Sequence, residues 1–186
     1  MAENIQILDL HFQPYISAEE IDNAVSRIAA DIDSKYLESD NPPVFICILN
    51  GSFVFSSDLM KKVKTSCQIE FVRLKSYQGT QSTENVQEVL GLEIDLQGRD
   101  VIVLEDIVDT GHTLDKFLKT LQAYKPRSVE IASLIFKKEA FKKSFKIDYL
   151  GFEIENKFIV GYGLDYNEYG RNIPEIYQIV HSNEVI

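Results

Sequence analysis

The chain has 186 residues, of which 45% are hydrophobic and 26% are charged, and its formal net charge is −10. This composition supplies enough apolar surface for one folded domain and excludes an intrinsically disordered chain. The negative charge argues against nucleic acid and anionic membranes as partners, because both are bound mainly through Lys and Arg near phosphates.

The amino terminus carries neither a basic leader nor an unbroken apolar run, and no later segment approaches ~20 apolar residues. Cys47 and Cys67 lie in apolar or strand-like runs, which favours buried, reduced thiols over a disulfide. We therefore expect a soluble, cytoplasmic protein.

The first predicted element is a helix over about residues 18–38. Ser17 and Glu20 have capping-box spacing, and apolar residues follow at helical intervals. The apolar run 44–49 then ends at Asn50-Gly51, which is typical of a strand buried on both faces and followed by a tight loop. Strands of this kind usually belong to parallel sheets.

The next segments alternate between strand and loop patterns. Residues 67–75 alternate apolar and polar positions like a half-buried strand, whereas residues 79–85 are polar and without period. We expect residues 79–85 to form a mobile loop and residues 88–94 to form the strand that returns from it.

Residues 101–104 are the next apolar run, an amphipathic helix is predicted between Gly111 and Pro126, and residues 128–136 are another strand. Strand, helix and strand in succession imply a right-handed parallel crossover. We therefore predict an α/β fold with an open, mainly parallel sheet flanked by helices. Ligands in such sheets bind beyond the carboxyl ends of the strands.

From about residue 147 the chain changes to short β-like segments rich in Tyr, Gly and Asn. We predict that residues 1–15 and 147–186 form a small β-rich hood on a core of about residues 16–146. The whole chain, residues 1–186, would then be a single domain.

The most informative segment follows the strand at 101–104. Glu105 and Asp106 come directly after the strand, and Asp109-Thr-Gly-His-Thr113 precedes the predicted helix. One interpretation is structural, with solvated charges at a strand end and a turn that caps a helix. The other is an anion site, because Gly111 lets backbone amides approach an oxyanion at a helix amino terminus.

The side chains of the same segment extend the second interpretation. The Thr110 and Thr113 hydroxyls can donate to phosphate oxygens, and the carboxylates can accept from vicinal sugar hydroxyls or hold magnesium. A phosphorylated sugar has partners for both sets of groups, since its phosphate can accept from the hydroxyls and amides and its own hydroxyls can donate to the carboxylates. The loop lacks the Gly-Lys-Ser/Thr ending of a Walker loop and is not a dinucleotide fingerprint.

Val103-Leu-Glu-Asp-Ile-Val-Asp-Thr-Gly-His-Thr-Leu114 resembles the phosphoribosyl-diphosphate-binding motif of type I phosphoribosyltransferases. Other segments resemble the hypoxanthine and hypoxanthine-guanine branch, so that the resemblance covers roughly residues 44–172. It implies purine salvage by Mg²⁺-dependent transfer of 5-phosphoribose from phosphoribosyl diphosphate to N9 of hypoxanthine, and of guanine. The products would be IMP or GMP and pyrophosphate, and the family's assemblies imply a homodimer or homotetramer.

The resemblance also assigns roles within the motif. Phosphoribosyl diphosphate would be bound by Glu105, Asp106, Asp109, Thr110, Gly111, His112 and Thr113. Asp109 would be catalytic, as general base or hydrogen-bond acceptor at purine N7. Glu105, Asp106 and Asp165 would hold Mg²⁺.

Two further segments resemble the parts of the family that enclose the diphosphate. Leu49-Asn-Gly51 is similar to the pyrophosphate loop, in which a non-trans peptide turns amides toward the diphosphate, and Arg171 would contact the same group. Asn50 departs from the Lys or Arg that the family commonly has there. Ser76 and Tyr77 resemble the pair that begins the mobile lid.

The purine would be bound by residues of the last third of the chain. Lys137 would donate to the 6-oxygen, Phe158 would stack on the base, the Ile159 backbone would read its edge, and Asp165 would lie nearby. Taken without the resemblance, Lys137 reads as a solvated charge and Phe158 as a core aromatic.

Two alternatives stay open. A transferase for xanthine or adenine is one, although Lys137 disfavours adenine, whose 6-amino group is itself a donor. The other is a regulator that keeps this fold and binds nucleic acid, against which the charge of −10 argues.

Overall fold

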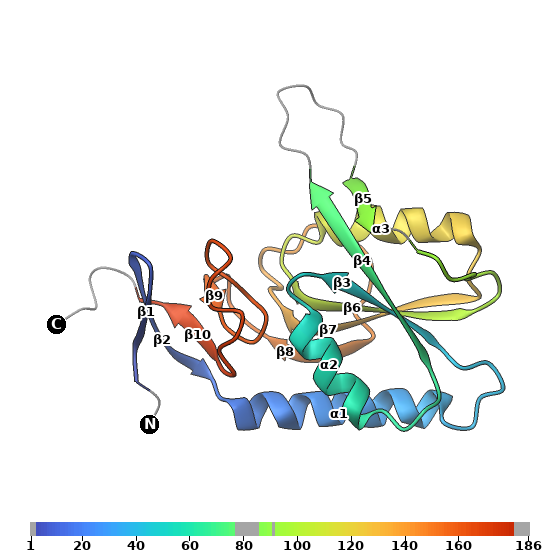
Figure 1. Ribbon diagram of the computed structural model, residues 1–186, viewed down its shortest axis with the longest axis horizontal. Coiled ribbons are helices and arrows are strands. Elements are labelled where there is room, and N and C mark those ends of the chain that lie inside the picture. The colour runs from blue at the N-terminus through green and yellow to red at the C-terminus, as the bar shows by residue number, and fades with distance from the viewer. Residues whose placement is uncertain (1–2, 77–85, 91, 181–186) are drawn as a thin grey trace.

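The computed structural model describes residues 3–76, 86–90 and 92–180, and these residues form two β-sheets and three α-helices (Figure 1). The larger sheet and its helices follow one another as α1 (Ala18–Tyr36), β3 (Val44–Leu49), α2 (Phe53–Lys62), β4 (Gln68–Ser76), β5 (Val86–Leu90), β6 (Asp100–Val108), α3 (His112–Leu121), the 3₁₀ turn η1 (Gln122–Tyr124), β7 (Ser128–Phe136) and β8 (Tyr149–Glu153). The smaller sheet contains β1 (Ile5–Ile7), β2 (Leu10–Ile16), β9 (Ile159–Val160) and β10 (Ile176–Ile179).

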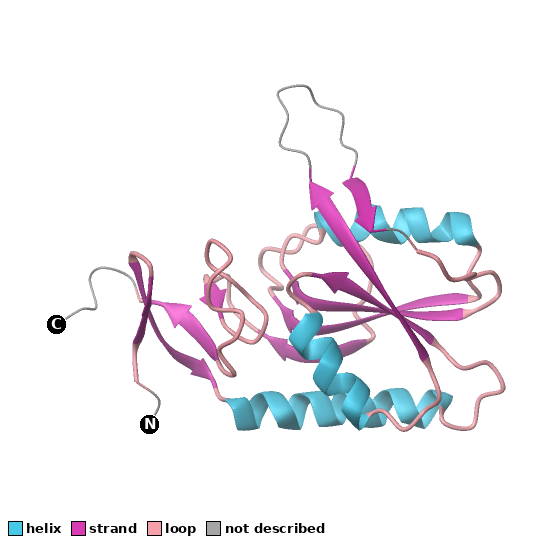
Figure 2. Cartoon of the chain, viewed as in Figure 1, coloured by secondary structure: helices cyan, strands magenta, loops and turns pink. Residues whose placement is uncertain are grey.

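The larger sheet has the strand order β5-β4-β3-β6-β7-β8. Strands β4, β3, β6, β7 and β8 run parallel to one another, and β5 is an antiparallel edge strand. Helices α1 and α2 cover one face of this sheet and α3 covers the other (Figures 1 and 2). The predicted open, mainly parallel sheet flanked by helices is therefore confirmed.

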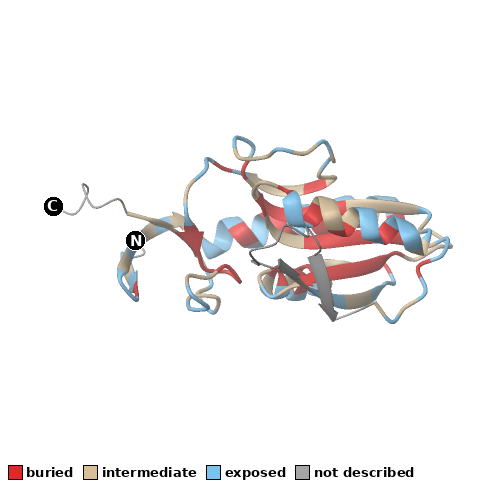
Figure 3. Cartoon of the chain, turned by 90° about the horizontal axis from the view of Figure 1, so that it is seen from above, coloured by how far each residue is buried: buried red, intermediate tan, exposed pale blue. Residues whose placement is uncertain are grey.

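The two faces of the sheet are filled by alternating residues of the same strands, because successive side chains of a strand point to opposite faces. In β6, Ile102 and Leu104 pack with residues of α1 and α2, whereas Val101 and Val103 pack with residues of α3. Since both faces are covered, the central strands are continuous apolar runs, and their residues appear as the buried layer in Figure 3.

Helix α1 begins at the predicted capping box. The Ser17 hydroxyl accepts from the Glu20 amide at 3.3 Å, and the Glu20 carboxylate accepts from the Ser17 amide at 2.9 Å. The helix ends at Tyr36, slightly before the predicted end. Both cysteines are free thiols, but only Cys47 is buried as predicted, since Cys67 precedes β4 and is exposed.

The smaller sheet is antiparallel, with the order β1-β2-β10-β9, and it joins the two ends of the described chain. It corresponds to the predicted hood, with one correction. Residues 149–153, which were predicted to belong to the hood, form β8 at the edge of the larger sheet, because their backbone pairs with β7 from Ala132 to Phe136. We propose a single domain whose hood consists of β1 and β2 together with the segment that follows β8.

The predicted mobile loop at 79–85 and the lid residue Tyr77 lie outside the described residues. Ser76 is the last residue of β4, where the backbone alone is described. The strand predicted to return from the loop is present as β5 and pairs with β4. No helix in the described part of the chain is long and apolar enough to cross a membrane.

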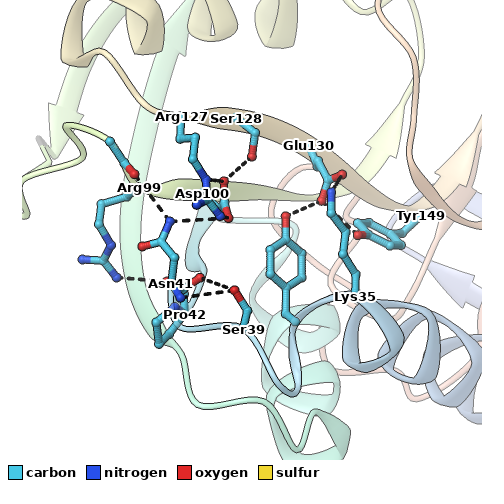
Figure 4. Close-up of polar contacts among 12 residues, drawn as sticks. Lys35, Ser39, Asn41, Pro42, Arg99, Asp100, Arg127, Ser128, Glu130 and Tyr149 are labelled. Atoms are coloured by element: carbon cyan, nitrogen blue, oxygen red, sulfur yellow. Dashed lines mark hydrogen bonds and ion pairs between the residues drawn. The ribbon is translucent and has the colours of Figure 1, made fainter.

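Two carboxylates at the amino ends of β6 and β7 are fully partnered (Figure 4). Asp100 accepts from the Arg127 guanidinium and from the Ser128 hydroxyl at 2.6 Å. Glu130 accepts from the Tyr36 and Tyr149 hydroxyls at 2.8 and 2.9 Å, and it also pairs with Lys35. These contacts join the end of α1 to β7 and β8.

We predict that Glu130→Gln lowers the free energy of unfolding at pH 7 by about 1–3 kcal/mol, because a carboxylate that accepts several hydrogen bonds loses its charge. Burial raises the pKa of Glu130, but the hydrogen bonds from Lys35, Tyr36 and Tyr149 outweigh it and hold the pKa below its usual value. The stabilisation is therefore present above the unfolded-state pKa and is lost as pH falls through the folded-state pKa.

Urea unfolding of both proteins at pH 7 and at about pH 3 measures this difference, which should shrink at the lower pH as wild type is protonated. Glu153→Gln is the control, because Glu153 pairs with Lys138 at the surface, where both side chains are about half exposed or more. Equal losses for the two variants at pH 7 would contradict the prediction.

Candidate active site

The strand order of the larger sheet places a crevice between β3 and β6. The chain leaves β3 toward β4 on one side and leaves β6 toward β7 on the other, so the loops after these two neighbouring strands diverge. The loop after β3 leads to α2 on one face, and the loop after β6 leads to α3 on the opposite face (Figure 1). The carboxyl ends of β3 and β6 therefore form the position at which an open α/β sheet binds ligands.

Residues 109–113, here called the motif loop, line a cavity of about 120 Å³ at this position. The other lining residues are Glu105, Ile107, Val108 and Leu114. Gly111 is in the left-handed conformation, with φ of 76°, and is the amino-terminal cap of α3. The first amides of α3 have no partners inside the helix, so the loop has the geometry of an oxyanion site.

The acidic pair near the carboxyl end of β6 is half-buried, and within it Glu105 Oε2 is shielded from solvent. Burial and then the charge of Asp106 raise the pKa of Glu105 well above its usual value. Burial also raises the pKa of Asp106 to about 6, although backbone hydrogen bonds and the charge of Arg171 act in the opposite direction. Although consecutive residues of a strand point to opposite faces, Asp106 is close enough to raise the pKa of Glu105, so a proton or a cation near either carboxylate is favourable.

One oxygen of this pair is without a partner. Glu105 Oε2 is buried and receives no hydrogen bond. An unpaired carboxylate oxygen fits a divalent cation, which prefers oxygen ligands. Within the described ranges no three His, Cys, Asp or Glu side chains lie close enough to hold a metal, so any ion at Glu105 and Asp106 would need water or substrate oxygens as further ligands.

Asp165 and Arg171 form a second charged pair in the turn region after β9. Arg171 Nη2 lies 2.7 Å from Asp165 Oδ1, and Arg171 Nη1 donates to the Gly163 carbonyl at 2.8 Å. Asp165 also accepts from the Glu168 amide at 2.7 Å. The structure thus places Asp165, a predicted metal ligand, in an ion pair with the arginine that was predicted to bind the diphosphate.

Glycines allow three segments to meet beside the acidic pair. A Cβ atom at Gly51 would lie 1.7 Å from Asp106 Oδ2, and one at Gly163 would lie 2.1 Å from the Gly51 carbonyl oxygen. Neither position has space for a side chain. The Leu49–Asn50 peptide just before this contact is cis, as the resemblance implies. The β3–α2 loop, the end of β6 and the turn at 163 are thereby packed backbone against backbone.

Lys137 lies directly after β7 and points at the motif loop. Its amide donates to the Val108 carbonyl at 2.9 Å, and its Nζ donates to Asp109 Oδ2 at 3.0 Å. The Lys137 side chain is only 8% exposed, so this lysine is no solvated surface charge. Its neighbour Lys138 is exposed and pairs with Glu153. The two residues predicted to contact the purine edge are therefore already paired with each other.

Phe158 and Ile159 lie on the hood. The Phe158 ring is 41% exposed and contacts Phe12 and Tyr166, with ring centroids 6.2 and 5.9 Å apart. Ile159 is buried in β9. An aromatic ring held by other rings at one edge, with much of its surface open, is suited to stacking on a flat base.

Some contacts around the site carry no signal in the sequence. The Tyr162 hydroxyl donates to Asp58 Oδ2 at 2.8 Å and joins the hood to α2, although the tyrosine reads as a packing residue. The Ser56 hydroxyl donates to the buried Cys47 sulfur at 2.9 Å beneath the β3–α2 loop. Ser and Tyr are common everywhere, so only the fold reveals such partners.

Comparison with known proteins gives one family for most of the chain. Residues 17–167 match the family model described as phosphoribosyl transferase domain. The chain is 40% identical over 162 residues to the hypoxanthine-guanine phosphoribosyltransferase of Staphylococcus epidermidis, covering 87% of this chain and 89% of that protein. It is 36% identical over 178 residues to the hypoxanthine-guanine-xanthine phosphoribosyltransferase of Tritrichomonas foetus, covering 95% of each.

A solved structure agrees with this result. The crystal structure of a hypoxanthine-guanine phosphoribosyltransferase from Bacillus anthracis superposes with a TM-score of 0.83 and 33% sequence identity. The superposition covers 91% of this chain and 97% of that one. The likeness therefore includes both the larger sheet and the hood.

We predict that Gly163→Ala destabilises the protein by roughly 1–3 kcal/mol more than Gly98→Ala, because the added methyl collides with the Gly51 carbonyl. Gly98 is a matched control, since it also has a positive φ, of 70°, but has no atom within 4 Å of an added Cβ. The control therefore measures the backbone penalty alone. Chemical unfolding of the three proteins tests the difference, and equal destabilisation would contradict the tight contact at Gly51.

Proposed function

The chain belongs to the phosphoribosyltransferase family, and from this premise we propose that it is a purine-salvage enzyme. It transfers 5-phosphoribose from phosphoribosyl diphosphate to N9 of hypoxanthine and guanine, and it releases pyrophosphate with IMP or GMP. The observation that carries the proposal is the cavity of about 120 Å³, which combines the oxyanion geometry of the motif loop with the half-buried carboxylate Glu105.

The motif loop binds the 5′-phosphate. Its backbone amides, the helix dipole of α3 and the hydroxyls of Thr110 and Thr113 all favour an anion. This local arrangement is needed because the protein as a whole has a charge of −10, which repels phosphates. His112 contributes its backbone amide at the start of α3.

The acidic pair binds the ribose and a divalent cation, which we propose to be magnesium. Glu105 and Asp106 accept hydrogen bonds from the two vicinal ribose hydroxyls and provide carboxylate oxygens to the hydrated ion. Magnesium held there would supply positive charge beside the leaving diphosphate. Asp165 would bind a magnesium ion with the oxygen that faces Arg171 only after its ion pair with that arginine, at 2.7 Å, is broken.

The Lys137–Asp109 pair recognises the purine. The ammonium donates to the exocyclic 6-oxygen of the base, and the Asp109 carboxylate accepts from N7. As N9 attacks the anomeric carbon, the N7 proton is drawn toward Asp109, while the C1–O bond to the diphosphate loosens. Phe158 stacks on the base, and the Ile159 backbone contacts its edge.

The leaving diphosphate is held at the contact between the β3–α2 loop and the hood. Amides of Leu49, Asn50 and Gly51 surround it, and Arg171 lies close enough to Asp106 to affect its pKa. Arg171 therefore supplies positive charge at the place where negative charge develops. Asn50 contributes no charge of its own.

The proposal extends to three properties. Ser76 and Tyr77 close over the site as a lid that excludes water, the chain assembles as a homodimer or homotetramer, and the protein works in the cytoplasm. Xanthine remains a rival acceptor because the relative from Tritrichomonas foetus is named for it. Adenine is disfavoured by Lys137, and a nucleic-acid-binding regulator by the charge of −10.

We expect product from hypoxanthine and guanine, and none from adenine, when each base is mixed with the protein, phosphoribosyl diphosphate and magnesium. A spectrophotometric assay follows the base-to-nucleotide conversion, and xanthine is included as a fourth acceptor. Chelation of the divalent ion should abolish turnover, and excess magnesium should restore it. Absence of product from every base would exclude the proposal and favour the regulator.

Asp109→Ala is expected to lower kcat by about 10²–10⁴, because the acceptor at N7 is lost. The KM for phosphoribosyl diphosphate should change far less, since the amides of the motif loop remain. Asp22→Ala is the control, because the Asp22 side chain on α1 is 64% exposed and pairs with Lys62 at the end of α2, which is not assigned to the site. Steady-state kinetics decide the matter, and an unchanged kcat would refute the role of Asp109.

A further inference from the structure

The segment that joins β7 to β8, residues 137–147, is here called the strap. Parallel strands are usually joined by a helix, but the strap has no regular secondary structure and is therefore among the segments coloured as loop in Figure 2. The Lys137 amide donates to the Val108 carbonyl at 2.9 Å, and the Lys142 amide donates to the Thr110 carbonyl at 3.2 Å. The strap is thus hydrogen-bonded to the motif loop and to the strand end before it.

Three aromatic rings stiffen the strap. Phe141 lies between Phe136 and Phe145, with ring centroids 5.1 and 5.0 Å away and interplanar angles of 77° and 80°. These edge-to-face pairs connect the strap to the last residue of β7. All three side chains pack against the apolar cluster that also contains Leu114 and Phe117 of α3.

The rings press against Gly111, the residue that starts α3. A Cβ atom at Gly111 would lie 2.8 Å from Phe141 Cε2 and 3.1 Å from Phe145 Cζ. The rings therefore occupy the space in which any other residue would place its side chain. A further tie is the ion pair between Lys143 and Asp115 in the first turn of α3, at 3.3 Å.

The motif loop depends on outside support, because the groups that bind an oxyanion there are backbone amides. Thr110 is partly exposed, and His112 and Thr113 are exposed. Gly111 has no side chain with which to anchor itself, and a free glycine has access to more backbone conformations than any other residue. Without support the amides would have to be ordered each time a ligand binds, which lowers affinity.

We propose that Phe141 and Phe145 are positioning residues that hold the motif loop, through Gly111, in the conformation that binds the 5′-phosphate. The inference rests on the proposed function, since it takes the phosphate of a nucleotide as the ligand of the motif loop. The two rings contact neither base nor diphosphate. Their removal weakens phosphate binding at this loop and leaves the β3–α2 loop intact.

Phe141→Leu and Phe145→Leu remove the rings one at a time and keep an apolar side chain. Titration calorimetry measures the binding of IMP or GMP, of the corresponding nucleoside and of pyrophosphate with magnesium. We expect Phe141→Leu to raise the Kd of the nucleotide about 10-fold, which corresponds to an ordering penalty of ~1.4 kcal/mol. The Kd values of nucleoside and pyrophosphate should stay within about 3-fold of wild type.

Two controls separate positioning from general loosening. Phe141→Tyr keeps the ring and should restore nucleotide affinity. Phe152→Leu removes a partly buried ring of β8 that packs on the α1 and α2 side of the sheet, and it should leave all three affinities unchanged. Hydrogen exchange provides a readout without ligand, because the amides of residues 110–113 should exchange faster in Phe141→Leu and Phe145→Leu than in Phe152→Leu.

The possible failures are distinct. The inference is overturned if folded Phe141→Leu and Phe145→Leu bind the nucleotide as wild type does, or if they lose pyrophosphate and nucleoside equally. It is also overturned if Phe152→Leu causes the same loss. If the wild-type protein binds no nucleoside monophosphate, the proposed function fails and this inference fails with it.

Discussion

The partial burial of two neighbouring carboxylates, Glu105 and Asp106, near the carboxyl end of a central strand is the constraint on which the rest of the site depends. Their charges are unfavourable in an apolar surrounding, and both pKa values are raised as a result. The position is tolerable because it lies at the carboxyl end of β6, where the loops after β3 and β6 diverge and leave room for a ligand. In the proposed function, a cation or sugar hydroxyls provide partners for these carboxylates.

Close packing of backbone around this pair fixes the relative positions of the loops that surround it. Gly51 and Gly163 bring the β3–α2 loop and the hood into direct contact with the end of β6, and Tyr162 fixes the hood on α2. On the other side the strap supports Gly111. The two loops to which we assign anion-binding amides are therefore positioned by neighbours distant in sequence. Such local amides would allow a protein with a net charge of −10 to bind phosphates.

Local signals in the sequence were sufficient for most of the fold. The capping box before α1, the apolar runs of β3 and β6 and the periodic face of α3 depend on neighbouring residues, and each is present. Strand β6 is longer than predicted, because it continues to Val108 and includes Glu105 and Asp106, which were expected to follow the strand. The edge strand β8 was misassigned because its place is decided by pairing with β7, which no local pattern reveals. The same limit applies to the site. Motif residues that are neighbours in sequence line one cavity, although Asp106 is not among them, whereas the Lys137–Asp109 pair and the strap depend on contacts across the fold.

The carboxylates at the two ends of the sheet differ in whether they find hydrogen-bond partners within the chain. At the amino ends, Asp100 and Glu130 have all their partners within the chain, whereas at the carboxyl end Glu105 keeps an oxygen without one. The carboxylates that stabilise the fold therefore lie at the amino ends of the strands, and the carboxylate left open to a ligand lies toward their carboxyl ends. Substitutions at the amino ends of these strands should therefore change the stability of the protein more than its proposed ligand contacts, which lie near the carboxyl ends.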